Sequence, residues 1–499
     1  MVVFIPSRFD LNFSPLSMTV LESEFHSDLF IGGHWQPSSS GARIEVFDPS
    51  TEAVLAEVAD ATVEDAQRAV EAASSAANTW KATAPRKRSE ILRRAYELMQ
   101  RDAEFLARLI SMENGKALSD ARGEVAYAAE FFRWFAEEAV RISGDISISP
   151  SGQSRIVVQY QPVGISLLIT PWNFPAAMAT RKIGPALAAG CTCILKPATE
   201  TPLTAYAIAA LLAEAGVPDG VVNVITTSTA GKVCGTILED PRVRKLSFTG
   251  STEVGRTLLR KAADSVINCS MELGGNAPFI VFDDADIEAA LDGAMLAKMR
   301  NGGEACTAAN RFYVQRNIAS EFSAKLADRM QALVVDDGVK SATQCGPLVN
   351  RASLAKVASL VDDAVTKGAK ILTGGQALSR TGFFYAPTVL TDVPPTADLL
   401  EEEIFGPVAP LVIFDDEAEA IRLANATEYG LVAYVYTRDL ARGLRVSELL
   451  ESGMIGLNRG LVSDPAAPFG GVKQSGLGRE GAHHGLLEFM EAKYISTAW

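Results

Sequence analysis

Cys306 is the side chain with the clearest capacity for nucleophilic chemistry in this sequence. It lies in the segment Met299-Arg-Asn-Gly-Gly-Glu-Ala-Cys-Thr-Ala-Ala-Asn-Arg311, between a helical pattern and a strand pattern. A structural cysteine usually occupies an apolar run, because a free thiol packs as a small hydrophobe. The glycines and polar residues around Cys306 instead predict an accessible thiol, which is a candidate nucleophile. The alternative is an inert loop cysteine.

Three further polar side chains could take part in chemistry, and two of them lie where an open α/β sheet binds its ligands. Asn173 follows the apolar run 165–169, and its amide N–H₂ can donate to an oxyanion. Lys196 follows the apolar run 191–195, where it is a candidate contact for a phosphate or a ribose, although most lysines are solvated. Glu272 lies in an apolar, glycine-rich stretch, so it is either a structural hydrogen-bonding group or a base with a raised pKa.

Two further segments suit a nucleotide. Residues 248–255 run from a strand through a glycine turn into a helix, and Ser251 or Thr252 can cap that helix, whose free N–H groups attract an anion. A plain capped turn is the alternative. Glu403 and Phe405 suit a ribose diol and a flat ring, with a surface loop as the alternative. The GxGxxG at 476–481 is rejected as a dinucleotide fingerprint, because no strand precedes it and too few residues follow it.

Histidines, cysteines and net charge exclude several classes of protein. The four histidines lie near the termini, so a papain-like hydrolase lacks its base and a zinc enzyme lacks its ligands. Six cysteines in 499 residues are too sparse for a disulfide framework, which indicates a reducing compartment. A formal charge of −14 disfavours nucleic acid and anionic membranes as partners. No apolar run approaches the roughly 18 residues of a membrane span. We therefore expect a cytoplasmic protein that needs no metal.

The elements that must position these residues form two successive α/β domains. Short strands and core-facing helices are predicted between residues 30 and 142, including a capping box at Thr62 and Asp65 and a helix over 123–142. Residues 146–162 alternate like a hairpin. From 163 onward strands and helices take turns, which is typical of a parallel sheet, and a second set begins at 277. The two domains join near Gly274-Gly275.

Six ordered motifs resemble the NAD(P)-dependent aldehyde dehydrogenase superfamily, and the resemblance covers nearly all of the chain after residue 25. The motifs are 171–175 (Pro-Trp-Asn-Phe-Pro), 248–251 (Phe-Thr-Gly-Ser), 271–276 (Met-Glu-Leu-Gly-Gly-Asn), the Cys306 segment, 403–407 (Glu-Ile-Phe-Gly-Pro) and 468–476 (Pro-Phe-Gly-Gly-Val-Lys-Gln-Ser-Gly). Residues 179–191, 274–283 and 476–481 are most similar to succinate semialdehyde dehydrogenases.

The resemblance implies an α/β fold with a Rossmann-type cofactor domain, an α/β catalytic domain and a small β oligomerisation arm. Residues 25–145 and 163–274 would form the cofactor-binding domain, and residues 275–486 the catalytic domain. Residues 146–162 and 487–499 would form the arm, which implies a homodimer or homotetramer. Residues 1–24 are expected to be an N-terminal extension, without the basic region of a signal peptide.

The family's roles transfer to matching positions in this chain. Cys306 would be the nucleophile, Asn173 the oxyanion donor and Glu272 the general base, with Lys182 and Glu480 as a proton relay behind the base. The substrate carboxylate would be bound by Arg181, Arg300 and Ser463, because guanidinium groups bind carboxylates bidentately. The implied cofactor contacts are Thr170, Trp172, Lys196, Thr199, Gly250, Ser251, Leu273, Glu403 and Phe405.

The implied reaction oxidises succinate semialdehyde to succinate with NADP or NAD, through a thiohemiacetal and a thioester of Cys306. Relatives that prefer NAD often carry glutamate at the position of Thr199, where it repels a 2′-phosphate, so NADP is slightly favoured. Oxidation of glutarate semialdehyde or of an uncharged aldehyde is the sibling alternative. A thiol acyltransferase or esterase that acts without nicotinamide is the remote one.

Three residues depart from the family pattern. Glu304 replaces the usual glutamine, and Ala308 replaces the second cysteine that several semialdehyde dehydrogenases carry two residues after the nucleophile. Without that cysteine, a local disulfide switch at Cys306 is not expected. Arg459 is an unusual basic residue near the expected substrate entrance, and it leaves the exact acid substrate open.

Overall fold

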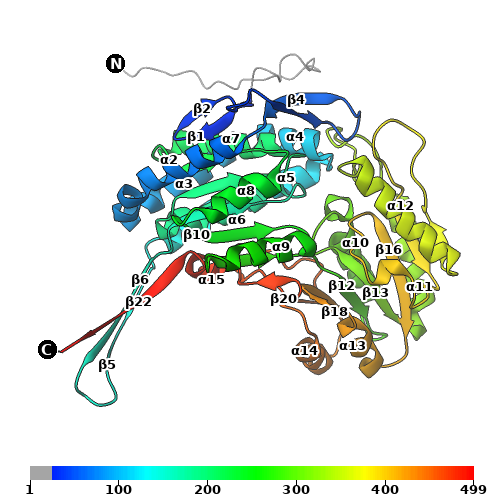
Figure 1. Ribbon diagram of the computed structural model, residues 1–499. Coiled ribbons are helices and arrows are strands. Elements are labelled where there is room, and N and C mark those ends of the chain that lie inside the picture. The colour runs from blue at the N-terminus through cyan, green and yellow to red at the C-terminus, as the bar shows by residue number, and fades with distance from the viewer. Residues whose placement is uncertain (1–24, 499) are drawn as a thin grey trace, which may run out of the picture.

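Two large sheets and a three-stranded arm organise the chain in the computed structural model, which describes residues 25–498 (Figure 1). The extension expected at 1–24 lies outside these residues. The first sheet has the order β2 (His34–Gln36), β1 (Leu29–Ile31), β9 (Val222–Val224), β8 (Cys193–Lys196), β7 (Ile165–Ile169), β10 (Val243–Thr249), β11 (Asn268–Glu272) and β21 (Gly476–Leu477). Its central strands β7 to β11 run parallel, as the alternation of patterns predicts.

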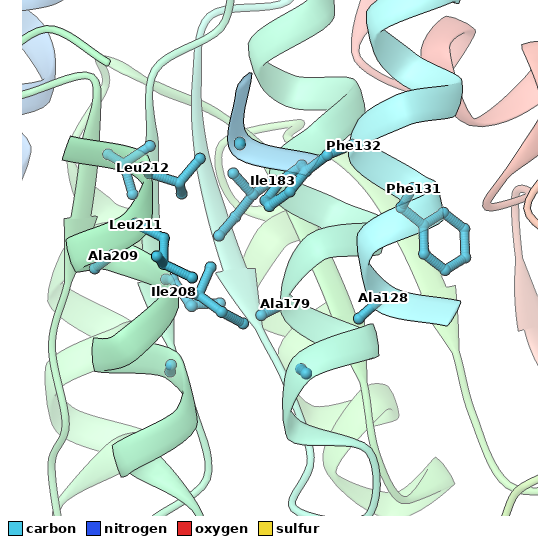
Figure 2. Close-up of a cluster of buried hydrophobic side chains, with 14 of the residues drawn as sticks. Ala128, Phe131, Phe132, Ala179, Ile183, Ile208, Ala209, Leu211 and Leu212 are labelled. Carbon is cyan, nitrogen blue, oxygen red and sulfur yellow. The ribbon is translucent and has the colours of Figure 1, made fainter. Parts of the chain in front are cut away.

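The first sheet is covered by helices on both faces, because its central strands are apolar on both sides. Leu168 of β7 and Leu195 of β8 belong to a buried cluster with α3 (Pro85–Arg101), α4 (Ala103–Asn114), α5 (Leu118–Glu138), α6 (Pro175–Ala189) and α7 (Pro202–Ala215). Figure 2 shows part of this cluster, where α5, α6 and α7 meet. The alternate residues Leu167 and Ile194 pack with α2 (Val63–Ala82), α8 (Ala230–Glu239) and α9 (Thr252–Ala263) on the other face.

The second sheet repeats this plan with seven strands. Its order is β14 (Lys370–Thr373), β15 (Thr388–Thr391), β16 (Val408–Phe414), β13 (Ala309–Gln315), β12 (Ala277–Val281), β18 (Val432–Tyr436) and β19 (Met454–Leu457). The helical segments of this part are α10 (Ile287–Met299), η1 (Arg300–Gly303), α11 (Arg316–Gln331), α12 (Arg351–Thr366), η2 (Asp398–Leu400), α13 (Glu417–Asn425) and α14 (Leu440–Leu449). Cys306 therefore lies between a helix and a strand, as predicted.

The predicted hairpin forms part of an arm. Strands β5 (Asp145–Ile148) and β6 (Arg155–Pro162) pair antiparallel, and β22 (Met490–Thr497) adds to the other edge of β6. The arm extends away from both sheets, with the C-terminus near its tip (Figure 1). Helix α15 (Ala482–Leu487) precedes β22, and two small ladders, β3 (Arg43–Phe47) with β4 (Val54–Ala59) and β17 (Tyr429–Gly430) with β20 (Val472–Lys473), complete the fold.

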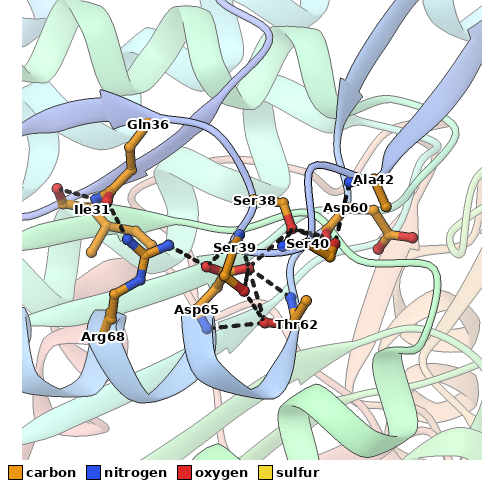
Figure 3. A network of polar contacts seen from close by, with 10 residues as sticks. All are labelled: Ile31, Gln36, Ser38, Ser39, Ser40, Ala42, Asp60, Thr62, Asp65 and Arg68. Atoms are coloured by element: carbon orange, nitrogen blue, oxygen red, sulfur yellow. Dashed lines mark hydrogen bonds and ion pairs between the residues drawn. The ribbon is translucent and has the colours of Figure 1, made fainter.

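Local sequence patterns predicted some helix ends correctly and others incorrectly. The capping box at Thr62 and Asp65 is confirmed, and Asp65 also accepts hydrogen bonds from the Ser39 N–H and pairs with Arg68 (Figure 3). The helix predicted over 123–142 is wrong at both ends, since α5 spans Leu118–Glu138. Gly123 lies inside the helix, which tolerates a glycine at modest cost. No helix within residues 25–498 is long and apolar enough to cross a membrane.

Candidate active site

The segment before Cys306 leaves helix α10 through a left-handed turn. Asn301, Gly302 and Gly303 have φ angles of 53°, 58° and 83°, a region that costs most residues energy and glycine little. Asn301 is held there because its N–H donates to Asp120 Oδ2 at 2.8 Å, and its Nδ2 donates to the carbonyl of Asn173 at 2.9 Å. The hydrogen bond from Asn301 to the Asn173 carbonyl thereby holds the segment of Cys306 against the segment that carries Asn173.

Cys306 is partly exposed and lines a cavity of about 600 Å³. Its polar neighbours Glu304 and Thr307 are buried, so the expectation of a polar, open loop is wrong for the flanks. Glu304 tolerates burial because its Oε1 accepts a hydrogen bond from the Val349 N–H at 3.1 Å. Burial raises the pKa of the Cys306 thiol to about 12, although the charges of Arg181 and Arg300 act in the opposite direction.

Asn173 lies just beyond β7, in the same cavity. Its Nδ2 donates one hydrogen bond to the carbonyl of Glu304 at 3.1 Å, two residues before the thiol. An amide N–H₂ carries two donor hydrogens, so a second donor is available. The Asn173 carbonyl accepts a hydrogen bond from Lys116 Nζ at 2.6 Å, and Lys116 is itself paired with Glu124 at 2.6 Å.

The sequence analysis missed this buried Lys116–Glu124 pair, which fixes the segment carrying Asn173. Glu124 Oε1 accepts hydrogen bonds from the Ala176 and Ala177 N–H groups at 2.8 and 3.2 Å, at the start of α6. A carboxylate at a helix N-terminus is favoured by the helix dipole. No sequence signal links Glu124 to α6, because the two are about fifty residues apart and meet only in the folded chain.

Glu272 ends β11 and is buried, and neither of its carboxylate oxygens has a hydrogen-bond partner among residues 25–498. Burial and the neighbouring charge of Glu480 raise its pKa well above the ordinary value, while Arg181 and Lys182 act in the opposite direction. A carboxylate with a raised pKa and free oxygens suits general-base chemistry near neutral pH. Gly470 leaves room for it, because a Cβ there would lie 2.9 Å from Glu272 Oε1.

Lys182 and Glu480, expected behind the base, lie together in a buried group of charges. Lys182 Nζ donates to Glu480 Oε1 at 2.5 Å and to Ser247 Oγ at 2.9 Å. Arg181 Nε lies 2.9 Å from Glu480 Oε2, an ion pair whose atoms are not aligned for a hydrogen bond. Burial raises the pKa of Glu480, but Lys182 and Arg181 outweigh it and hold the pKa below its usual value.

The three residues expected to bind a carboxylate lie at two places, Arg300 with Ser463 at one and Arg181 at the other. Arg300 Nη2 is 3.2 Å from Thr307 Oγ1 and 3.5 Å from Ser463 Oγ. The Arg181 guanidinium instead stacks on the Phe469 ring, with 4.3 Å between the Cζ atom and the ring centroid. Its Nη1 is buried without a hydrogen-bond partner among the described residues. Arg459, by contrast, is exposed.

Every residue expected to contact the cofactor lines the same cavity as Cys306 and Asn173: Thr170, Trp172, Lys196, Thr199, Gly250, Ser251, Leu273, Glu403 and Phe405. Glu272, Lys182, Glu480, Arg181, Arg300 and Ser463 are not in that lining. Ser251 caps α9 by accepting a hydrogen bond from the Val254 N–H at 3.4 Å, and Gly250, Ser251 and Val254 place this helix N-terminus in the cavity lining.

The chemistry of this lining fits a dinucleotide. Lys196 is buried, and no ion pair of its ammonium with a carboxylate occurs within residues 25–498. Burial lowers its pKa, an effect that a bound anion would offset. Glu403 Oε1 accepts a hydrogen bond from the Gly275 N–H at 3.1 Å, and burial raises its pKa to about 7. Trp172 and Phe405 meet edge to face, with ring centroids 5.3 Å apart.

Comparison with known proteins shows which sequences and structures this chain resembles. The aldehyde dehydrogenase family profile matches residues 35–495. The succinate-semialdehyde dehydrogenase of Paenarthrobacter nicotinovorans is 56% identical over 89% of this chain and 99% of its own length. The glutarate-semialdehyde dehydrogenase of Pseudomonas putida is 49% identical over 94% of this chain and 98% of its own length. A crystal structure of an Escherichia coli NADP-dependent enzyme superposes with a TM-score of 0.94 at 47% identity, covering 96% of this chain and 99% of the other. The chain belongs to the aldehyde dehydrogenase family.

Proposed function

We propose that this enzyme oxidises succinate semialdehyde to succinate, using NADP⁺ in preference to NAD⁺. The observation that carries the proposal is the cavity that brings Cys306 and Asn173 together with the buried Lys196 and the N-terminus of α9. The 56% identical succinate-semialdehyde dehydrogenase supports the substrate, and the NADP-dependent structural relative supports the cofactor.

In this proposal the Cys306 thiol gives its proton to a water molecule in the cavity, and Sγ then bonds to the aldehyde carbon. The carbonyl oxygen becomes an oxyanion that Asn173 Nδ2 and the N–H of Cys306 stabilise. A nicotinamide held by the residues of this cavity would supply the oxidising power, as a hydride acceptor. Glu272 then removes a proton from a water molecule, whose oxygen attacks the Cys306 thioester; the C–S bond breaks and releases the acid and the Cys306 thiolate. Lys182 and Glu480 take the proton onward from Glu272.

The positions around the cavity also support the cofactor assignment. Lys196 and the N-terminus of α9 would hold phosphate and ribose groups, Glu403 a ribose diol, and Trp172 with Phe405 the wall near the nicotinamide. Thr199 bears no charge, and its hydroxyl lies 3.2 Å from Glu200 Oε2. A 2′-phosphate therefore meets no carboxylate at position 199, while Glu200 leaves NAD⁺ usable.

A panel of aldehydes assayed with both cofactors tests the proposal. Succinate semialdehyde should give the highest kcat/KM, ahead of glutarate semialdehyde and butanal. In Arg300→Met, KM for succinate semialdehyde should rise roughly tenfold or more, since a hydrogen-bonded charge is worth about 1.5–3 kcal/mol. KM for butanal should not change. Arg422→Met, at an exposed arginine, is the control. An unchanged KM for succinate semialdehyde in Arg300→Met would rule out carboxylate binding there.

Glutarate semialdehyde is the second candidate substrate, because a 49% identical relative bears that activity in its name. It differs from succinate semialdehyde by one methylene, a difference that a pocket discriminates by about 1–3 kcal/mol. If kcat/KM is higher for glutarate semialdehyde than for succinate semialdehyde in the same panel, glutarate semialdehyde is the substrate. The alternative of a thiol esterase without nicotinamide does not fit a member of this family.

We also propose that residues 25–145 and 163–274 form the cofactor-binding domain and residues 275–486 the catalytic domain. The arm of residues 146–162 and 487–499 would join two copies of the chain into a homodimer, or two dimers into a homotetramer. Its exposed apolar side chains support this, since Ile146, Ile148 and Tyr494 are 73%, 60% and 60% exposed. Six free cysteines support the cytoplasm as the compartment.

A further inference from the structure

Tyr127 carries a buried hydroxyl that forms no hydrogen bond within residues 25–498 and has no role in the proposed reaction. The residue lies in α5, and its ring packs at an angle of 66° on the Phe131 ring, with centroids 4.9 Å apart. The ring is partly exposed, but the hydroxyl oxygen is buried and has no hydrogen-bond partner among residues 25–498. Because leaving a buried hydroxyl unpaired costs free energy, such a group calls for a ligand.

Contacts with Phe131 place the Tyr127 ring near Arg181, one of the residues proposed to bind the carboxylate. The Arg181 guanidinium lies over the other ring of the pair, 5.7 Å from the Phe131 centroid to Cζ. In Figure 2 the Phe132 ring points toward Ile183 in the core, whereas the Phe131 ring lies on the other side of α5. Tyr127 and Arg181 therefore both lie against the Phe131 ring, and each has a buried polar atom without a hydrogen-bond partner in the described part of the chain.

The electrostatics of Tyr127 agree with this placement. Burial raises the pKa of the phenol, so the group is a neutral hydrogen-bond donor. The positive charges of Arg181 and Arg300 act to lower that pKa, and Glu480 and Cys306 act to raise it. The hydroxyl is thus within electrostatic reach of both proposed arginine anchors and of the nucleophile.

We propose that Tyr127 Oη donates a hydrogen bond to the distal carboxylate of the aldehyde substrate, beside Arg181 and Arg300. This inference rests on the proposed function, and it makes Tyr127 a residue that determines specificity. A carboxylate satisfies the phenol and the free Nη1 of Arg181, whereas a methyl group at the same place leaves both unpaired. A site built to bond a polar group rejects the analogue that lacks it for this reason.

Tyr127→Phe tests the inference, because it removes the hydroxyl alone. KM for succinate semialdehyde should rise about tenfold, the size expected for one hydrogen bond to a charged group. The kcat should stay within about twofold, and so should kcat/KM for butanal, which has no carboxylate. The melting temperature of the free enzyme should not fall, since the hydroxyl bonds to no described residue.

Tyr206→Phe is the matched control. The Tyr206 hydroxyl lies 2.7 Å from Thr226 Oγ1 in the core, away from the proposed site. Its loss should lower the melting temperature and leave KM for both aldehydes unchanged. The inference is overturned if Tyr127→Phe leaves KM for succinate semialdehyde unchanged, or if it reduces kcat/KM equally for both aldehydes. A wild-type enzyme that shows no preference for carboxylated aldehydes would instead contradict the proposed function.

Discussion

Lys182 and Glu480 form a buried ion pair, with 2.5 Å between Nζ and Oε1, next to the carboxylate proposed as the general base. The charge of Glu480 contributes to the raised pKa of Glu272, while the charge of Lys182 opposes it. The two members of the pair therefore shift the pKa of Glu272 in opposite directions. The pH dependence of the reaction should therefore change when either charge of the pair is removed.

Glu480→Gln should shift the acidic limb of the kcat/KM profile to lower pH. Glu272 must be deprotonated to act, so activity rises with pH through its pKa, and removing a neighbouring negative charge lowers that pKa. Lys182→Met should shift the limb to higher pH. Breaking a buried pair costs about 3–5 kcal/mol, so rates must be normalised to folded protein by circular dichroism. Shifts in the same direction for both variants would contradict the assigned charges.

Asn173→Ala should lower kcat roughly 100- to 1,000-fold, the effect of removing one oxyanion donor. KM should change little, because the donor acts mainly on charge that develops in the transition state. Steady-state kinetics measure both values. Thr192→Ala, at a buried polar residue outside the cavity lining, is the control. A loss in Asn173→Ala that appears only in KM would assign Asn173 to ground-state binding instead.

Alkylation of Cys306 in the free enzyme should be slow at about pH 7 and rise without a plateau to about pH 10, because only the thiolate reacts. Burial raises the thiol pKa to about 12, and the charge of Glu272 contributes in the same direction. Glu272→Gln should therefore speed the reaction at high pH. Mass spectrometry of the Cys306 peptide after iodoacetamide treatment gives the rates. A plateau near neutral pH would show that the thiolate already forms without substrate.

Thr199→Glu should lower kcat/KM for NADP⁺ by about 10- to 100-fold and affect NAD⁺ much less. A carboxylate at position 199 would repel a 2′-phosphate, and one close charge pair at intermediate dielectric is worth a few kcal/mol. Thr199→Gln introduces a side chain of the same size as glutamate without its charge, so it distinguishes the effect of charge from the effect of size. Equal losses for the two cofactors in Thr199→Glu would place the 2′-phosphate elsewhere in the cavity.

Replacing apolar residues of the arm should change the oligomeric state. Ile146→Asp with Ile148→Asp introduces two charges into the exposed apolar edge formed by β5. Light scattering coupled to size exclusion should show a smaller assembly than the wild type. The same double substitution to threonine, which keeps β propensity, should have a weaker effect. An unchanged mass for the aspartate variant would argue against β5 as the interface.

Sequence patterns alone determined the architecture of this protein. The run 165–169 coincides with β7, because buried parallel strands need continuous apolar residues between turns. The same patterns placed Asn173 and Lys196 at the carboxyl ends of strands, where parallel sheets bind their ligands, although Lys196 is the last residue of β8 and not the residue after it. Helix ends were less certain, as α5 shows, because an internal glycine and a terminal glycine look alike in sequence.

Only the tertiary structure decided the charges and partners in the site. Glu304 follows two glycines, as a surface residue often does, but it is buried and accepts a hydrogen bond from the Val349 N–H. Arg181 forms an ion pair with Glu480, about 300 residues later in the chain. Neither the hydroxyl of Tyr127 nor the Lys116–Glu124 pair carries a local signal. Desolvation and Coulomb energies depend on distance and on the exclusion of water, and packing between distant segments sets both. The sequence determined which residues can react, and the packing decided their protonation and their free hydrogen-bonding atoms.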